Sequence, residues 1–445
     1  MTAQLAKVLE RFLGLIFLPT LACEKSIGMN QFAYTKGRGA RDALAYLVLS
    51  WLQAFREKSS VALYMSDVSG AFDRVSTKRL ISKLRARGMP DDVLQVVESW
   101  LRRREAEVIV GGVASNRMTL ENMVFQGTVW GPSLWNVFYA DARQAIHKHA
   151  FEEIVFADDL NAWKRFEAHT PKQTMLEDMA SCQKELHAWG RANQVVFDCD
   201  KEHMLILSRQ RPHGQSFKLL GVDFDCKLVM SDAVFDLTTK CKWKLKAILR
   251  TKKFNTSEGL FNLYKAQILS YIEYRTAAVY HACSTSLAAL ESVQTKLLEA
   301  AGVTEVEALL NFRLAPLSAR RDMALLGLIH RTVLGKGPVQ FKRFFQIDEQ
   351  AVHVDKRQHS LQLKKVELHW SDFALPGSRP AAYIQNSMFG LIQVYNTTLP
   401  PEVVEASPSV SSFQSKLQEI LMLRADATEP GWQYSFSPRG TRNFS

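Results

Sequence analysis

Runs of apolar residues predict several strands in the first half of the chain. The continuous apolar run at 61–65 is typical of a strand with both faces buried. Two further runs, 154–156 and 160–163, enclose Asp158 and Asp159, and this pattern predicts a β-hairpin with the acidic pair at or beside its turn. Burying two aspartates is costly unless cations compensate them, so this hairpin is the first candidate for a functional site.

Apolar residues at helical spacing predict helices around these strands. The clearest is an amphipathic helix that ends at Pro19, and others begin near Asp42, Thr77, Asp91 and Pro132. A segment from residue 105, with glycines at 111 and 112, predicts a surface hairpin. No apolar run approaches the roughly 18 residues that a membrane-spanning helix needs. We therefore expect a globular protein without a signal peptide, a transmembrane segment or a membrane partner.

A pair of adjacent aspartates is weak evidence by itself. Asp91 and Asp92 are also adjacent, but they follow Pro90 and are expected to be first-turn helix residues. The pair at 158–159 differs because it lies between apolar strands and because Asp67 ends the predicted strand at 61–65. Strand ends are common ligand sites, although Asp67 alone could equally cap the next turn. Three carboxylates suit Mg²⁺, which takes oxygen ligands and shares them with substrate phosphates.

Charge and cysteine spacing narrow the class of partner. The formal net charge is +11 and the pI about 9.3, which favours a polyanionic partner, nucleic acid before membrane. The six cysteines form no C-x-x-C or zinc-type pattern, so a reduced protein without a zinc knuckle is expected. The predicted location is intracellular, in the cytoplasm, the nucleus or both.

Two basic segments are candidates for phosphate contacts. Arg38 and Arg41 lie in a glycine-containing loop that could hold phosphate, and a solvated turn is the alternative. Later, seven cations follow one another without an acidic residue, interleaved with apolar positions: Lys240, Lys242, Lys244, Lys246, Arg250, Lys252 and Lys253. They predict a helix that packs by its apolar stripe and contacts nucleic-acid phosphates, with a merely solvated basic face as the alternative.

The order of these features resembles the reverse transcriptase of non-LTR (LINE-type) retrotransposons. Residues 67–73, DVSGAFD, are similar to the family's first palm motif, and residues 156–159, FADD, to its third. Between them, Gln126–Gly127 with Gly131–Pro132 resembles the second motif. The resemblance extends from about residue 4 to 221 and more weakly beyond.

The resemblance implies an α+β fold of the right-hand polymerase type. Its palm is an antiparallel sheet packed on helices, with partial fingers before it and a mainly helical thumb and C-terminal region after it. The expected parts are partial fingers at 1–60, palm at 61–230, thumb-like helices at 231–300, a mainly helical region at 301–405 and a poorly ordered tail at 406–445. Because the family's basic fingers strand and endonuclease are not found here, an N-terminally truncated element is expected.

The family's catalytic roles map onto individual residues. Asp67 and Asp158 are implied to be the main metal ligands, Asp159 completes the catalytic set, and Val68 joins the metal site. Two Mg²⁺ ions, for which Mn²⁺ can substitute, activate the primer 3′-hydroxyl and clamp the leaving pyrophosphate. The implied partners are an RNA template, a DNA primer and deoxynucleoside triphosphates.

A second group of residues is implied to bind the nucleotide. Phe72 corresponds to the aromatic gate that excludes a ribose 2′-hydroxyl, and Gln126 and Gly127 line the nucleotide pocket. Lys201 resembles a lysine near the triphosphate that can act as a general acid, although Asp198 stands where the family usually has asparagine. Arg38 and Arg41 are partial replacements for the missing basic strand.

Two functions remain open at this stage. The first is an RNA-directed DNA polymerase, favoured by the retained acids, because crowded carboxylates repel one another and contribute little without a metal. The alternative is a catalytically impaired relic that keeps only nucleic-acid binding, favoured by the incomplete fingers. RNA-templated RNA synthesis is disfavoured by Phe72.

Overall fold

The computed structural model describes residues 4–22, 24–102, 104–120, 122–350, 359–366 and 382–439. The chain forms two compact units, each built from two segments. Unit 1 comprises Met1–Ala43 and Lys58–Gly214, and unit 2 comprises Leu44–Glu57 and Gln215–Ser445. The boundaries of the two units differ from those of the five expected parts. The functional names of these parts, such as fingers, palm and thumb, stay predictions.

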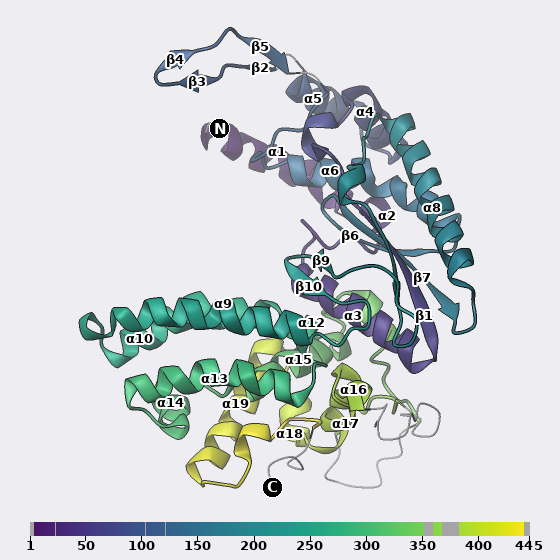
Figure 1. The fold of residues 1–445 in the computed structure, drawn as a ribbon. Coiled ribbons are helices and arrows are strands. Elements are labelled where there is room, and N and C mark those ends of the chain that lie inside the picture. The colour runs from purple at the N-terminus through teal and green to yellow at the C-terminus, as the bar shows by residue number, and fades with distance from the viewer. Residues whose placement is uncertain are drawn as a thin grey trace. The chain divides into compact units, whose positions relative to one another are not determined.

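An antiparallel four-stranded sheet is the centre of unit 1 (Figure 1). Its strands, in spatial order, are β6 (Glu152–Phe156), β7 (Asp159–Glu167), β1 (Ser59–Ser66) and β8 (His203–Leu207). The central strand β1 is buried along almost its whole length because it pairs on both sides. Ser66 pairs with Leu160, so the end of β1 and the start of β7 lie at the same edge of the sheet. The predicted strand and acidic hairpin are confirmed.

Helices pack on this sheet and complete unit 1. They are α1 (Gln4–Leu21), α2 (Glu24–Ile27), α4 (Thr77–Ala86), α5 (Asp91–Leu101), α6 (Gly131–Tyr139), α7 (Arg143–His147) and α8 (Lys172–Asn193), with short 3-10 turns η1 (Ala71–Arg74), η2 (Ala140–Ala142) and η3 (Cys199–Lys201). Helix α1 continues past Pro19, where the sequence predicts its end, because the Ala22 amide bonds the Leu18 carbonyl and closes a further turn.

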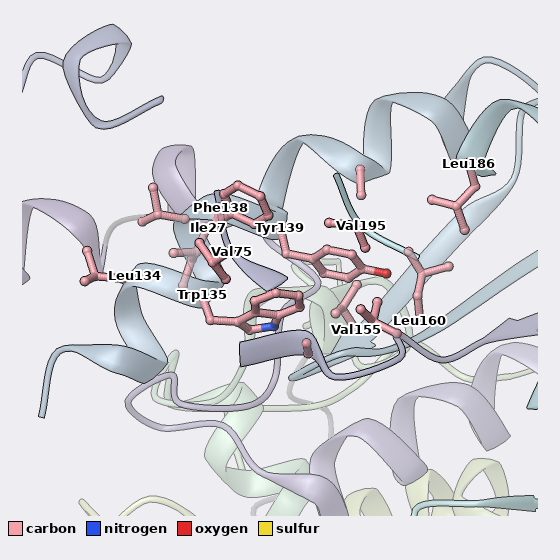
Figure 2. Packing of buried hydrophobic residues seen from close by; sticks show 14 of the residues in the cluster. Ile27, Val75, Leu134, Trp135, Phe138, Tyr139, Val155, Leu160, Leu186 and Val195 are labelled. Atoms are coloured by element: carbon pink, nitrogen blue, oxygen red, sulfur yellow. The ribbon is translucent and has the colours of Figure 1, made fainter. Parts of the chain in front are cut away.

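Helix α6 carries the large side chains of the unit 1 core. Pro132 lies in the first turn of the helix, directly after Gly131, where its missing N–H costs nothing. Trp135 and Tyr139 lie one turn apart on the same face, and Figure 2 shows them beside Val155 and Leu160 of the acidic hairpin. The core therefore packs directly beneath the strands that bear the acids.

A surface hairpin projects from the end of α5 in Figure 1, as the glycine pair predicts. It consists of β2 (Arg104–Ala106), β3 (Ile109–Val110), β4 (Val113–Ala114) and β5 (Met118–Leu120), which pair β2 with β5 and β3 with β4. Gly111 and Gly112 have φ angles of 59° and 84°, which form the turn and favour glycine.

Unit 2 is mainly helical, as predicted for the second half of the chain. Its helices are α3 (Ala40–Arg56, in this unit from Leu44), α9 (Ser231–Arg250), α10 (Ser257–Tyr264), α11 (Ser270–Tyr274), α12 (Thr276–Val279), α13 (Ser284–Ala301), α14 (Glu305–Phe312), α15 (Leu317–Val333), α16 (Ala382–Gln385), α17 (Met388–Thr397), α18 (Pro401–Val404) and α19 (Val410–Asp426). The α+β class, with an antiparallel sheet on helices and a helical second half, is confirmed.

Aromatic contacts join the segments of unit 2. Trp51 of α3 packs edge-on against Phe217 and Phe224 of a small hairpin, at centroid distances of 6.2 and 5.7 Å. That hairpin pairs β9 (Phe217–Leu219) with β10 (Val222–Phe224). Helices α9 and α13 run side by side in Figure 1. None of the described helices in either unit combines the length and apolar character of a membrane span.

The expectation of a poorly ordered tail at 406–445 is wrong for most of its length. Helix α19 lies there, and Phe413, Leu417 and Leu421 are buried at a four-residue spacing. The Ser409 side chain caps the helix by accepting a hydrogen bond from the Ser412 amide (3.1 Å). The apolar stripe outweighs the serine-rich composition. Residues 440–445 and the proline- and serine-containing stretch at 376–378 lie outside the described residues.

Candidate active site

The acidic pair lies at a two-residue turn between β6 and β7. Phe156 pairs with Asp159, which leaves Ala157 and Asp158 as the loop. Ala157 has φ 62°, a left-handed conformation that is unfavourable for a residue with a Cβ atom. Such strain persists only where surrounding contacts hold it, and it is frequent at functional sites.

Three hydrogen bonds hold this turn. The Gln31 side-chain oxygen accepts from the Ala157 amide (3.1 Å), and the Gln31 side-chain nitrogen donates to the Ala157 carbonyl (3.3 Å). The Trp135 indole N–H donates to the same carbonyl (3.0 Å). Gln31 is only 4% exposed, so these bonds are shielded from water. Gln31 and Trp135 therefore fix the backbone that carries the acidic pair.

Asp67 directly follows the last residue of β1. Its carbonyl accepts a hydrogen bond from the Asp198 amide (3.0 Å), and the Ser69 amide donates to Val196 (2.9 Å). Val68 pairs with Phe197 between these two bonds, so the pairing does not use the Val68 carbonyl. The segment after β1 is thus held against the segment before β8.

Lys201 is the cation that meets the acids. Its ammonium lies 2.7 Å from Asp67 Oδ2 and 3.4 Å from Asp198 Oδ2. The Asp67 side chain is 19% exposed, whereas Lys201 is 61% exposed. The hydrogen bond and the charge of Asp67 raise the pKa of Lys201, so it is fully protonated at neutral pH.

Burial and neighbouring negative charges raise the pKa values of Asp158 and Asp159. Burial raises the pKa of Asp159 to about 6, and the negative charges of Asp158 and Asp67 add to this effect, while Lys201 opposes it. Burial also raises the pKa of Asp158, with repulsion from Asp67 adding to it against the effects of a backbone hydrogen bond and Lys201. One lysine thus leaves a surplus of negative charge that further cations would neutralise.

This surplus predicts that Asp159→Asn stabilises the metal-free protein. An acid whose pKa is raised on folding is destabilising once it ionises, so its cost grows as pH rises from about 4 through 6 and is complete at pH 7. We expect the melting temperature at pH 7 to rise by about 2–4 °C, the shift that about 1 kcal/mol produces in a domain of this size. Thermal melts in chelator-containing buffer measure it. A gain of equal size at pH 4 would contradict this explanation.

A stack of aromatic rings lies next to the acids. Phe72 of η1 stacks on Trp135 with a centroid distance of 5.7 Å and an interplanar angle of 25°, and Trp135 stacks on Tyr139 at 5.1 Å and 18°. Burial, followed by the charges of Asp158 and Asp67, raises the pKa of Tyr139 well above its usual value. No described side chain forms a hydrogen bond with the Tyr139 hydroxyl. Stacking on Trp135 therefore fixes the ring of Phe72, the predicted gate residue.

The loop with Gln126 and Gly127 is exposed and is tied to helix α1. The buried Glu10 carboxylate accepts hydrogen bonds from the Val129 amide (2.5 Å) and from the Trp100 indole (3.1 Å). Gly127 has φ 79°, which favours glycine, and open space surrounds the position of a Cβ atom. A ligand can therefore approach this backbone closely.

In the contacts that the structure shows, neither of the two predicted arginines lies against the acids. Arg38 donates hydrogen bonds to the carbonyls of Met29 and Gln31, the latter at 3.2 Å, and lies over the Phe32 ring. Arg41 is exposed at the start of α3. Arg38 thus contacts the strand segment that includes Gln31.

The seven predicted nucleic-acid contacts lie in unit 2, on α9 and the 3-10 turn η4 (Lys252–Phe254). The apolar stripe expected at Trp243, Leu245, Ile248 and Leu249 is confirmed in part: Leu245 and Ile248 are buried, together with Cys241, Leu249 is half-buried and Trp243 is exposed, while the cations are mostly exposed. Lys244 is half-buried and lies over the Tyr271 ring at 4.1 Å. Trp243 and Phe254, among these cations, are 68% and 77% exposed. Basic and aromatic groups therefore share this surface, and the role in binding nucleic acid stays a prediction.

Sequence reasoning finds the acids, Phe72 and Lys201 but not the residues that hold them. Gln31, Glu10 and Tyr139 act through contacts with partners far away in the sequence. For Gln31 the sequence offers no signal, because a glutamine between Asn30 and Phe32 looks like an ordinary loop residue.

The carboxylates of Asp67, Asp158 and Asp159 are donors that suit hard divalent cations, although the three side chains do not point to a common centre in this structure. Across the part of the chain that the structure describes, no three His, Cys, Asp or Glu side chains are grouped closely enough to hold a metal ion. The Lys201 ammonium occupies one oxygen of Asp67 instead. Carboxylate oxygens, such as those of Asp158 and Asp159 with their raised pKa values, are nevertheless the ligands that Mg²⁺ prefers. The fold and these residues define a carboxylate site at the edge of an antiparallel sheet, suited to cations and phosphates.

Comparison with known proteins identifies the family. Residues 1–224 match the family model described as "Reverse transcriptase (RNA-dependent DNA polymerase)", which is half of the chain. The chain belongs to this reverse transcriptase family. The resemblance to the reverse transcriptases of non-LTR retrotransposons is confirmed by this match and by relatives from mobile elements.

Two relatives and one solved structure illustrate the similarity. The RNA-directed DNA polymerase from mobile element jockey of Drosophila melanogaster is 26% identical over 321 residues, which cover 66% of this chain and 34% of that protein. The probable RNA-directed DNA polymerase from transposon BS of the same organism is 30% identical over 139 residues, 31% of this chain and 15% of that protein. A telomerase from Candida tropicalis, in complex with a fragment of telomeric RNA, aligns with a TM-score of 0.39 and 13% identity over 76% of this chain and 51% of its own. The chain spans about a third of the length of the jockey relative.

Proposed function

We propose that this chain is an RNA-directed DNA polymerase of a non-LTR retroelement. The observation that carries the proposal is the position of Asp67, Asp158 and Asp159 at one edge of the sheet, in a chain of the reverse transcriptase family. In the reaction, a primer 3′-hydroxyl attacks the α-phosphorus of a deoxynucleoside triphosphate and pyrophosphate leaves.

The three aspartates and the Val68 carbonyl would hold two Mg²⁺ ions, or Mn²⁺ in their place. Bound ions supply a charge clamp for the attacking and leaving oxygens. Lys201 is protonated and exposed beside Asp67, so it can donate a proton to the departing pyrophosphate. Ligation of Asp67 by a cation would release Lys201 for this role.

The remaining residues select and orient the substrates. Phe72, held on Trp135, would block a 2′-hydroxyl and so favour deoxynucleotides. Gln126 and Gly127 offer an exposed backbone to the template and the nucleotide. Arg38 and Arg41 would contribute positive charge toward the triphosphate, and the basic residues of α9 and η4 would contact the backbone of the RNA template and DNA primer. An intracellular location agrees with the reduced thiols of Cys182 and Cys241.

Primer extension tests the proposal. We expect the protein to extend oligo(dT) on poly(rA) with thymidine triphosphate and Mg²⁺, to stop when a chelator removes the metal, and to resume when Mg²⁺ or Mn²⁺ is restored. Template binding without any incorporation would contradict the polymerase and support the alternative of an impaired relic that only binds nucleic acid.

A further inference from the structure

A basic pocket lies within unit 2, and the acidic site of unit 1 contributes nothing to it. Its volume is about 430 Å³, within the range of ligand sites. Four segments line it: the end of α3, the end of the 3-10 turn η6 (Val339–Arg343) with the residues after it, the segment at 364–366, and α17. The lining residues are Gln53, Arg56, Glu57, Arg343, Phe344, Gln346, Lys364, Lys365, Val366 and Phe389.

Aromatic rings hold the two arginines of the pocket. Arg343 donates a hydrogen bond to Ser50 Oγ (2.7 Å), and its guanidinium lies 4.7 Å from the ring centroids of both Tyr46 and Phe344. Arg56 lies 5.6 Å from the centroid of Phe389. Phe344 and Phe389 are buried, so they support the guanidinium groups and do not offer free faces to a base.

The two lysines belong to a segment that is pinned by backbone and amide hydrogen bonds. The Lys364 amide donates to the Gln346 carbonyl (2.8 Å). Asn396 forms two bonds with Leu363, accepting from its amide (2.9 Å) and donating to its carbonyl (2.8 Å). The backbone at the rim of the pocket is therefore fixed, while the side chains of Lys364 and Lys365 are exposed.

The charge of the lining favours an anion. Among the described residues that line the pocket, four side chains are cationic and one, Glu57, is a carboxylate, which lies 3.6 Å from Arg56 and accepts a hydrogen bond from Gln53 (3.0 Å). The planar guanidinium group matches phosphate oxygens in a bidentate arrangement, and supporting rings pre-organise it. A phosphate group is thus the best-matched ligand.

We propose that this pocket binds the phosphodiester backbone of a single-stranded nucleic acid, at a contact separate from the polymerase site. The choice of nucleic acid among phosphate ligands rests on the proposed function. A cavity of this volume accommodates about one nucleotide unit and no duplex. Since the rings are covered by arginines, binding is independent of base identity.

Binding of a fluorescein-labelled oligouridylate to the full chain, measured by anisotropy without nucleotides or Mg²⁺, tests the proposal. The test variant is K364E/K365E, and the matched control is K227E/K296E, which changes the charge equally at two exposed unit 2 lysines outside the pocket. We expect the test variant to bind about tenfold more weakly than the control. The slope of log affinity against log salt concentration should also fall in magnitude by about 1. Equal affinity of the two variants would overturn the proposal, provided that both melt cooperatively. K365Q serves as the milder variant if the double variant does not fold.

Competition and a primer-extension assay complete the test. Unlabelled oligoadenylate should compete as well as oligouridylate, whereas duplex RNA and polyglutamate should compete poorly. Equal competition by polyglutamate or duplex would overturn the assignment to single-stranded nucleic acid. If the protein fails to extend primers but K364E/K365E still weakens oligouridylate binding, the polymerase proposal is refuted and the proposal for the pocket is retained.

Discussion

Asp158→Asn is expected to reduce primer extension by about 1,000-fold or more, because removing a ligand of the catalytic cations forfeits several kcal/mol of transition-state stabilisation. The substitution keeps the size of the side chain and removes a charge that Asp67 repels. We therefore expect the fold to be unharmed, with a melting temperature equal to or above that of the unaltered chain. Steady-state incorporation on poly(rA)/oligo(dT) measures the effect.

The matched control is Asp92→Asn, because Asp91 and Asp92 form the other pair of adjacent aspartates in unit 1 and are exposed in the first turn of α5. This control should retain full activity. Incorporation that survives Asp158→Asn would rule out the proposed site, whatever the result for Asp92.

Gln31→Leu is expected to lower kcat by about 10- to 100-fold, since an error of about 1 Å in a catalytic group can cost that much. The variant leaves the Ala157 amide without its acceptor and removes one of two donors from the Ala157 carbonyl. The turn would then relax from φ 62°, and the acids would move with it. Because Gln31 acts on the turn and does not touch a substrate, KM should change little.

Gln31→Glu separates positioning from general stability. Glutamate keeps the acceptor for the Ala157 amide and loses the donor to the carbonyl, so its kcat should lie between those of the unaltered chain and Gln31→Leu. Gln173→Leu, on the exposed face of α8, is the control and should have no effect. Loss of activity that follows only a fall in melting temperature, with no intermediate value for glutamate, would contradict the positioning role.

The sequence predicts the candidate acids better than the residues that hold them in place. Two apolar runs on either side of Asp158 and Asp159 reveal the hairpin, because this pattern lies within ten consecutive residues. The contact of Gln31 with Ala157 spans 126 residues and that of Glu10 with Val129 spans 119, and no local pattern encodes such pairs. The unit 2 pocket escapes for the same reason, since four separate segments supply its lining.

Near the C-terminal end, amino-acid composition gives the wrong prediction and the spacing of apolar residues gives the right one. Serine and proline near the C-terminal end suggest disorder, yet Phe413, Leu417 and Leu421 follow one another at helical spacing and form a buried stripe. Pro19 similarly suggests a helix end, but one missing amide does not stop α1 when the next hydrogen bond forms beyond it.

The register of the central sheet has a consequence for how the proposed active site forms. Ser66 opposes Leu160, and Phe156 opposes Asp159, so the pairing alone decides which face each acid occupies. A slip of one residue would turn the Asp159 side chain to the opposite face. Strands β1 and β7 are separated by almost a hundred residues, so bringing them together costs loop-closure entropy. Asp67 and the acidic pair should therefore share one edge only once β1 has paired with β7, and a chain in which these strands are unpaired should be inactive even if its helices have formed.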